Sequence, residues 1–364
     1  MLEPTRRQFL AGGLGAVALG ALAACGGGSS SSASGSGSVS STTTKTYTLA
    51  ELEDNAQKEG GTLVYYTLGQ DIADAQIKGF KAKYPWANIS TRIDNGRRTL
   101  TKLVQEAQAK APTADVFVNT STTVPINIRK QLAALTKVPN DADTPAQFKD
   151  PSAYGHAFYL NVQSLAYNTN LVTTALPTDI YDLGDSSFRG KIAMDSPQNT
   201  APGYFFLSSQ RKKWGEDKWN TWLKAMKAND IFLAQSATSA YQAVVSGERA
   251  IAPDNADDVL SEKAGTPVKM SFYDGVPTQI FYLYTNLRVK HPYMANLFIN
   301  WSLSEDGQKA IASTGRSPVL QIDSPLAINK LLPNGITVAT EDATNDMVNN
   351  QQSYLSAYNS LWPV

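Results

Sequence analysis

The fold is decided by residues 62–94, which read TLVYYTLGQDIADAQIKGFKAKYPWANISTRID. Runs rich in β-branched and aromatic side chains open and close this stretch, at 62–67 and 88–94, and they predict two strands. Between them, Asp71 can cap a helix whose apolar residues recur on one side and which Pro85 ends. The stretch therefore predicts a strand, a helix and a second strand in succession.

The same unit repeats further along the chain. Residues 95–98 predict a turn, and a helical stripe then runs up to Pro112. The run ADVFVN at 114–119 predicts a third strand, and 120–123 opens another helix. Repeated β-α-β units predict a parallel sheet with helices on both faces.

A second β/α series follows the Pro/Asp-rich stretch at residues 139–155. Strands are expected at 158–168, 191–194, 231–234, 250–252, 268–273 and 279–285, with helices at 201–228, at 239–246 and from His291-Pro292 onward. We expect two discontinuous α/β lobes, the first made of 47–155 plus 275–364 and the second of 156–274. Near the end, Tyr354, Tyr358, Leu361 and Trp362 have the spacing of a helix that docks on the rest of the protein.

The first 46 residues indicate where in the cell the protein is located. A twin-arginine pattern, TRRQFL at 5–10, precedes an apolar stretch that ends at Ala24, which is shorter than the roughly 20 residues a membrane span needs. The stretch ends in LAAC, which resembles the lipobox of bacterial lipoproteins. We expect residues 1–24 to be a signal peptide, Cys25 to carry a lipid, and the Gly/Ser/Thr-rich segment up to residue 46 to be a flexible tether outside the cytoplasm.

Composition excludes several classes of protein. The 32 basic and 32 acidic residues balance, so the basic excess of a nucleic-acid binder is missing. One Cys and two His allow neither an internal disulfide nor a His-rich metal site. No Gly-x-Ser-x-Gly occurs and two His make a catalytic triad difficult, so we expect a binding protein, not an enzyme, with no cofactor. A carboxylate pair such as Asp254 with Asp258 is the remaining enzymatic hypothesis.

Several ordered segments resemble a known family. They are WGEDK at 214–218, AMKAN at 225–229, AVVSGE at 243–248 and the segment from His291-Pro292 to Gln308. Across roughly residues 60–320 the chain resembles bacterial extracellular solute-binding proteins of ABC importers and, within them, the ferric-ion-binding type. The resemblance implies a two-lobe, type II periplasmic-binding-protein-like α/β fold that closes on a ligand between its lobes. It also implies delivery of the solute to a membrane permease, and we expect the receptor to be a monomer.

The chain departs from the ferric-binding pattern at one place. Those proteins carry an adjacent Tyr-Tyr pair just after the Ser-Gly-Glu segment, where this chain reads AIAPDNADD at 250–258. Its Tyr65-Tyr66 pair lies in the first predicted strand, where alternation sends the two rings to opposite faces. We therefore expect a small anionic or zwitterionic solute. A ferric-ion or ferric-chelate carrier with other ligands is the alternative.

Polar residues follow most of the predicted strands. Ligands of open α/β sheets bind at the carboxyl ends of strands, near helix N-termini. That rule selects Thr67, Gly69, Gln70, Gly96, Arg97, Arg98, Thr120, Ser121, Ser196, Asn199, Thr200, Ser236, Thr238, Asp254 and Asn255, to which the crossover adds Tyr273. An arginine suits a carboxylate or phosphate, and Asp254 suits an ammonium group. Each Ser or Thr also has the simpler interpretation of a helix cap.

Overall fold

The computed structural model describes residues 46–363, apart from 112, 121, 122, 125, 175, 178, 200, 201 and 341–345. The predicted signal peptide, the predicted lipid site at Cys25 and nearly all of the tether lie outside the described residues, as do the predicted ligand residues Ser121 and Thr200. Among the described residues, no helix combines the length and apolar character that crossing a bilayer requires.

A mixed sheet organises the first lobe. Strands β1 (Thr62–Thr67), β2 (Asn88–Ile93) and β3 (Val116–Thr120) run parallel, as the repeated units predict. The order continues from β3 to β9 (Val276–Thr285) and β4 (Gly155–Asn168) and ends at β10 (Ser317–Pro318). These last pairings are antiparallel, so the expectation of a wholly parallel sheet is wrong at this edge.

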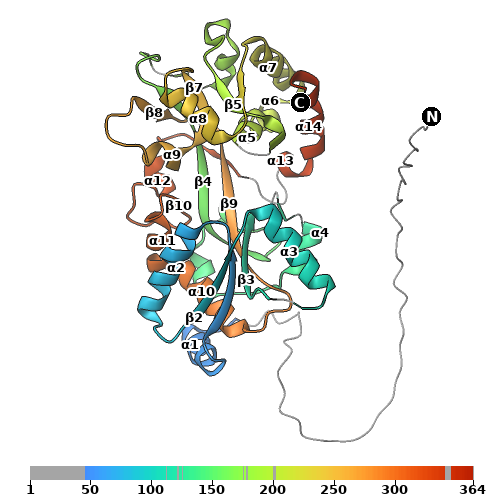
Figure 1. Ribbon diagram of the computed structural model, residues 1–364, viewed down its shortest axis with the longest axis vertical. Coiled ribbons are helices and arrows are strands. Elements are labelled where there is room, and N and C mark those ends of the chain that lie inside the picture. Colours follow the sequence, from blue (N-terminus) through green and yellow to red (C-terminus); the bar gives the residue numbers. More distant parts are fainter. Residues whose placement is uncertain are drawn as a thin grey trace, which may run out of the picture. The chain divides into compact units, whose positions relative to one another are not determined.

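Strands β4 and β9 continue beyond the first lobe into the second (Figure 1). Their register runs from Gly155 opposite Tyr284 to Val162 opposite Thr278. Past this point β4 pairs instead with β7 (Ile251–Asn255) and β8 (Val268–Ser271), and β9 pairs with β11 (Val338–Thr340). A separate two-stranded sheet of β5 (Ala193–Asp195) and β6 (Phe232–Ala234) belongs to the second lobe. The result is the two-lobed α/β fold that the sequence predicts.

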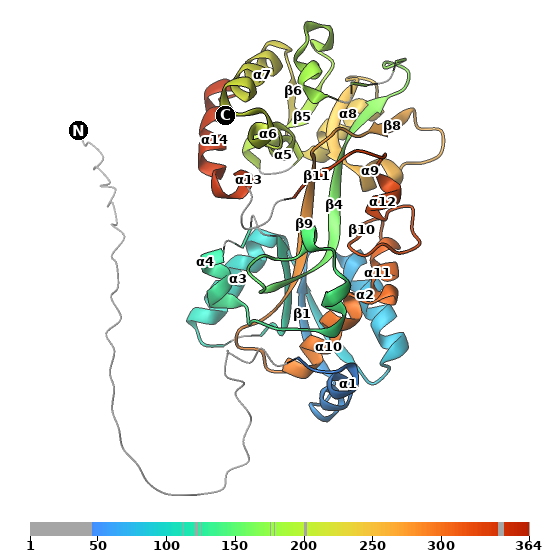
Figure 2. The same cartoon turned by 180° about the vertical axis from the view of Figure 1, so that it is seen from behind.

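Helices cover both faces of the first-lobe sheet (Figure 2). Helices α2 (Gln70–Lys83), α10 (Pro292–Ser302) and α11 (Glu305–Ala312) lie on one side, with α3 (Gly96–Gln108) and α4 (Ile126–Leu132) on the other. The remaining helices of this half are α1 (Leu49–Lys58), α12 (Ile328–Leu331) and the 3-10 turns η1 (Pro139–Asp143) and η2 (Ala146–Phe148).

The tyrosine pair in β1 divides between the two faces, as alternation predicts. Tyr65 packs on Phe298 and donates to Gln76, whereas Tyr66 donates to Glu106 on the other side. Each ring therefore belongs to a different part of the apolar core, and the pair does not act together.

The second lobe is mainly helical. Its helices are α5 (Pro202–Ser208), α6 (Arg211–Trp214), α7 (Glu216–Ala228), α8 (Ala237–Val245), α9 (Ala256–Leu260), α13 (Asp346–Asn349) and α14 (Gln351–Leu361), with 3-10 turns η3 (Ile180–Gly184), η4 (Ser186–Phe188) and η5 (Pro197–Asn199). The sequence predicts one or two helices over 201–228, but there are three. Gly215, with a φ of 77°, separates α6 from α7 because this left-handed backbone cannot continue a helix.

The C-terminal helix packs on the second lobe, not on the first to which the predicted boundaries assign it. The hydroxyls of Tyr358 and Ser208 lie 2.6 Å apart, and the Tyr354 ring stands edge-on to Trp219 with centroids 5.2 Å apart. Amphipathic spacing predicts that α14 docks, but it does not say on which surface. The other lobe boundaries stay a prediction.

Candidate ligand-binding cleft

A cavity of about 710 Å³ lies where the carboxyl ends of the first three strands face the second lobe. Its volume falls in the range of sites for small organic ligands. The residues that line it are Leu68, Asn95, Gly96, Arg97, Leu100, Asn119, Thr120, Thr123, Gln198, Asn199, Gln279, Phe281, Gln351 and Leu355. They come from the ends of β1, β2 and β3, from β9, and from η5 and α14 of the second lobe.

The N-terminus of α3 forms one wall of the cavity. The sequence predicts a turn at 95–98, but Asn95 caps the helix by accepting from the Arg98 N–H at 2.9 Å, and Gly96 is already its first residue. Asn119 of β3 donates to the Gly96 carbonyl at 2.9 Å. A Cβ on Gly96 would lie 2.7 Å from the Asn119 Oδ1, so this close approach requires glycine. The partial positive charge of a helix N-terminus faces the cavity here.

The two predicted arginines differ in position. Arg97 lines the cavity, and its exposed guanidinium makes no ion pair with any described residue. Arg98 does not line the cavity, and its Nη1 lies 3.8 Å from an Asp94 carboxylate oxygen. One step along a helix turns the side chain by about 100°, so neighbours point in different directions. Arg97 is thus the only cationic side chain among the described lining residues.

The predicted Thr120 and Asn199 also line the cavity, from opposite lobes. The hydroxyls of Thr120 and Thr123 lie 3.1 Å apart, and the predicted helix start at 120–123 is wrong because α4 begins at Ile126. Next to Asn199, Gln198 donates to the Trp362 carbonyl at 3.0 Å and so ties η5 to the end of the chain. Contact of these residues with a solute stays a prediction.

Strands β4 and β9, the hinge strands, continue from one lobe into the other (Figure 1). The hinge strand β9 supplies residues that the sequence analysis missed. Gln279 and Phe281 lie inside a strand, two residues apart on one face, and both line the cavity. Phe281 stacks on Tyr159 of β4 with centroids 4.2 Å apart. Nothing in a strand's own sequence says which face meets a cleft, so only the pairing of β9 with β3 and β4 could have selected them.

Most of the other predicted ligand residues lie away from this cavity. Thr67 is wholly buried, and Gln70 donates to Asp74 at 2.8 Å. Gly69, and not the expected Asp71, is the N-cap residue of α2. These positions flank β1 without lining the described cavity.

In the second lobe, the simpler interpretation of helix capping holds. Ser236 caps α8 by accepting from the Ser239 N–H at 3.1 Å, and Thr238 is exposed within the same helix. Ser196 donates to Gln198 at the rim and does not line the cavity. Tyr273 is fully buried and packs edge-on to Phe206, so it belongs to the core.

The acidic segment lies within a strand and not after one. Strand β7 extends to Asn255, which places Asp254 opposite Ser164 of β4 and leaves it 2% exposed. Burial, together with the neighbouring Asp258 carboxylate, raises the pKa of Asp254 to about 8. Neither Asp254 nor Asn255 lines the cavity.

The acidic helix α9 lies close to a cation of the first lobe. Burial and Asp258 raise the pKa of Asp257 to about 6, and Arg316 opposes this rise. Arg316 also forms an ion pair with Asp71 at the start of α2. No group of three or more His, Cys, Asp or Glu side chains in the described part of the chain is arranged to hold a metal ion.

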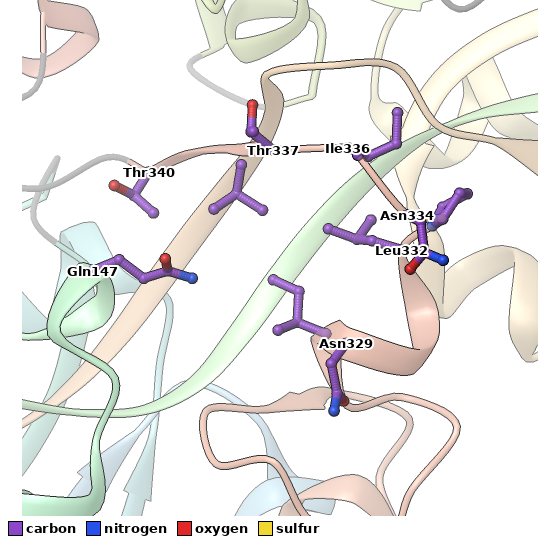
Figure 3. A pocket seen from close by; sticks show the side chains of 11 residues that line it. Gln147, Asn329, Leu332, Asn334, Ile336, Thr337 and Thr340 are labelled. Atoms are coloured by element: carbon purple, nitrogen blue, oxygen red, sulfur yellow. The ribbon is translucent and has the colours of Figure 1, made fainter.

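A second cavity, of about 420 Å³, lies beside β11, the strand that pairs with β9 (Figure 3). Gln147 and Thr340 approach it from one side, and Leu332 and Asn334 from the other. Its described lining combines amide, hydroxyl and aliphatic groups without a charged side chain.

Comparison with known proteins decides the family. The family model described as bacterial extracellular solute-binding protein matches residues 109–336. The chain belongs to this family. Its members are transport proteins that bind solutes outside the cytoplasm, and they are not enzymes. The resemblance found in the sequence is therefore confirmed. An uncharacterised protein of Haemophilus influenzae is 23% identical over 275 residues, covering 72% of this chain and 78% of the relative.

Solved structures show the same fold at low sequence identity. Iron-bound HitA from Pseudomonas aeruginosa is 21% identical with a TM-score of 0.68, and the match covers 83% of this chain and 99% of HitA. The periplasmic binding protein AfuA from Actinobacillus pleuropneumoniae, with fructose-6-phosphate bound, is 20% identical with a TM-score of 0.61, covering 82% and 98%. A substrate-binding protein of an ABC transporter from Agrobacterium tumefaciens is 16% identical with a TM-score of 0.66, covering 83% and 94%. These matches support the two-lobed fold of this chain.

Proposed function

We propose that this protein is a lipid-anchored receptor that captures a small anionic solute in the cleft and delivers it to an ABC permease. The observation that carries the proposal is the position of Arg97, an exposed guanidinium without an ionic partner among the described residues, beside the N-terminus of α3. Both features favour a carboxylate or phosphate, because the guanidinium can bind two of its oxygens at once and the helix end adds positive potential.

The ferric alternative has less support. HitA is an iron-bound relative, but Tyr65 and Tyr66 of this chain are committed to opposite faces of β1. The segment after Gly247-Glu248 carries aspartates where the ferric-binding pattern has its tyrosine pair. AfuA, which holds a sugar phosphate, shows that the same fold also accommodates an organic anion.

The decisive experiment compares two neighbouring arginines. The probes are phosphate esters, phosphonates and carboxylates, tested first by thermal shift and then by calorimetry on the body that begins at Thr46. We expect Arg97→Ala to weaken the best anionic probe by about 10–100-fold, since a hydrogen bond to a charged group contributes about 1.5–3 kcal/mol. Arg98→Ala is the matched control and should change affinity by less than about threefold.

Two results would count against the proposal. If Arg97→Ala and Arg98→Ala weaken binding equally, long-range charge and not a contact at Arg97 attracts the solute. If no anion binds but ferric citrate does, with the visible absorption of an iron–phenolate complex, the protein is a ferric carrier with ligands outside the predicted set.

A further inference from the structure

Three carboxamide side chains share one face of the hinge strands. Asn161 of β4 lies directly opposite Gln279 of β9 in the antiparallel register, so both side chains project to the same side. Gln279 lines the cavity, which identifies that side as the cleft side. Gln163 follows two residues after Asn161 and therefore projects to the same face. Of the three, Gln279 lines the cavity directly, and Asn161 and Gln163 share its strand face without being lining residues.

The hydrogen-bonding capacity of these three side chains is largely unused. Gln163 is 2% exposed, and its Nε2 donates to the Pro202 carbonyl at 3.4 Å, which fixes its orientation. Its Oε1 and the Oδ1 of Asn161 are buried without a hydrogen-bond partner among the described residues. The half-buried Gln279 side chain makes no hydrogen bond with any described residue either.

Some other amides of the cavity are already occupied, whereas Asn199 and Gln351 form no side-chain hydrogen bond with a described residue. Asn95 caps α3, Asn119 is held against Gly96, and Gln198 is tied to the end of the chain. Buried carbonyl oxygens are nearly always paired in native proteins, so unpaired ones beside a cleft point to donors supplied by the ligand.

The charge of the lining decides which donors fit. The described lining residues include no Asp or Glu, and Asp254 projects to the opposite face, because it pairs with Ser164 while Gln163 pairs with Asn255. An ammonium group would be desolvated there without a counter-charge. Hydroxyl groups can donate to neutral carbonyl oxygens at no such cost, and the Phe281 ring offers an apolar surface to a carbon skeleton.

We infer that the solute is a polyhydroxylated acid, such as a sugar or polyol phosphate or a sugar acid. Its anionic group binds at Arg97 and the N-terminus of α3, and its hydroxyls bind the hinge carboxamides Asn161, Gln163 and Gln279. The inference rests on the proposed function. It also chooses between the two solute classes that the sequence analysis left open, since it favours a hydroxylated anion over a zwitterion.

The test uses pairs of acids that differ only in their hydroxyl groups. The pairs are glycerol 3-phosphate with n-propyl phosphate, sorbitol 6-phosphate with n-hexyl phosphate, and gluconate with hexanoate. We expect the hydroxylated member of at least one pair to bind at least tenfold more tightly to the unmodified protein. Gln279→Leu and, separately, Gln163→Leu should remove most of that preference and leave the affinity for the deoxy member unchanged. Gln105→Leu, at an exposed position on α3 outside the cavity, is the control.

The outcomes separate this inference from the proposed function. Equal affinity within every pair overturns the inference while the anion receptor stands. A preference that survives both glutamine variants overturns the assignment to the hinge carboxamides. If no member of any pair binds, the inference fails. If none of the phosphate esters, phosphonates and carboxylates binds either, the proposed anion receptor fails as well. The wild-type comparison needs no variant, so a misfolded variant cannot hide the result.

Discussion

The buried carboxyl group of Asp254 makes the stability of the second lobe depend on pH. Asp254 is 2% exposed, and burial, with help from Asp258, raises its pKa to about 8. Because the folded protein retains a proton that the unfolded chain loses near pH 4, this group contributes a stability at low pH that falls as the pH rises from about 4 to about 8. The neutral amide of Asp254→Asn does not titrate.

We therefore expect the stability of Asp254→Asn relative to the wild type to increase between pH 5 and pH 8. Urea unfolding at both pH values measures the difference. Asp217→Asn, at an exposed position in the first turn of α7, is the control and should follow the wild type throughout. A constant difference between Asp254→Asn and the wild type at the two pH values would show that Asp254 keeps an ordinary pKa.

The residue scale also shows where sequence reasoning reaches its limit. Arg97 and Arg98 are chemically identical neighbours, and both follow a predicted strand. Only the start of α3 at Gly96 sets which of them faces the cavity. The pattern therefore predicts an arginine at the site but cannot choose between the two.

At the scale of elements, one aspartate joins two strands and a helix of the first lobe. The buried Asp115, just before β3, accepts from the Val64 N–H of β1 at 2.9 Å. It also accepts from the Lys290 N–H at 3.0 Å and from His291 Nδ1 at 2.9 Å, at the start of α10. One carboxylate thus links the start of α10 to β1.

We expect Asp115→Ala to lower the free energy of unfolding by about 2–4 kcal/mol, because it leaves several partly buried donors without an acceptor. Asp115→Asn keeps one acceptor oxygen and should lose less. Guanidinium unfolding measures both, with Asp217→Ala as a surface control expected within about 0.5 kcal/mol of the wild type. An effect of Asp115→Ala no larger than that of the control would show that water replaces these contacts.

At the scale of the whole molecule, the proposed attachment to the membrane rests on the sequence before Thr46. We expect the full chain, expressed in a bacterial host with its own signal, to incorporate labelled fatty acid, and Cys25→Ala to incorporate none. Gel autoradiography after metabolic labelling measures this. An unlabelled wild-type chain would contradict the proposed lipid anchor, even if the protein were recovered with the membrane fraction.

The body beginning at Thr46 should bind the same solute with unchanged affinity, because the Gly/Ser/Thr-rich segment has little apolar surface to bury. This comparison belongs with the labelling experiment. A loss of affinity on truncation would show that the tether takes part in binding.

The sequence by itself determined the β-α-β repetition, the helix after His291, the docking character of α14 and the set of loops from which a ligand site could be built. These features depend on contacts between near neighbours along the chain, through hydrophobic periodicity and turn chemistry. The rule that ligands bind at the carboxyl ends of strands found Gly96, Arg97, Thr120 and Asn199. It succeeds because it depends on the direction of parallel strands and not on their particular sequence.

Only the tertiary structure decided which strand faces meet the cleft. It brought Gln279 and Phe281 of β9 to the cavity, turned Asp254 to the opposite face by extending β7 to Asn255, and seated α14 on the second lobe. Each of these results depends on the register of strands far apart in the sequence or on the surface available to an amphipathic helix. A shift of one residue in register moves a side chain to the other face of the sheet. The local sequence pattern does not determine that register.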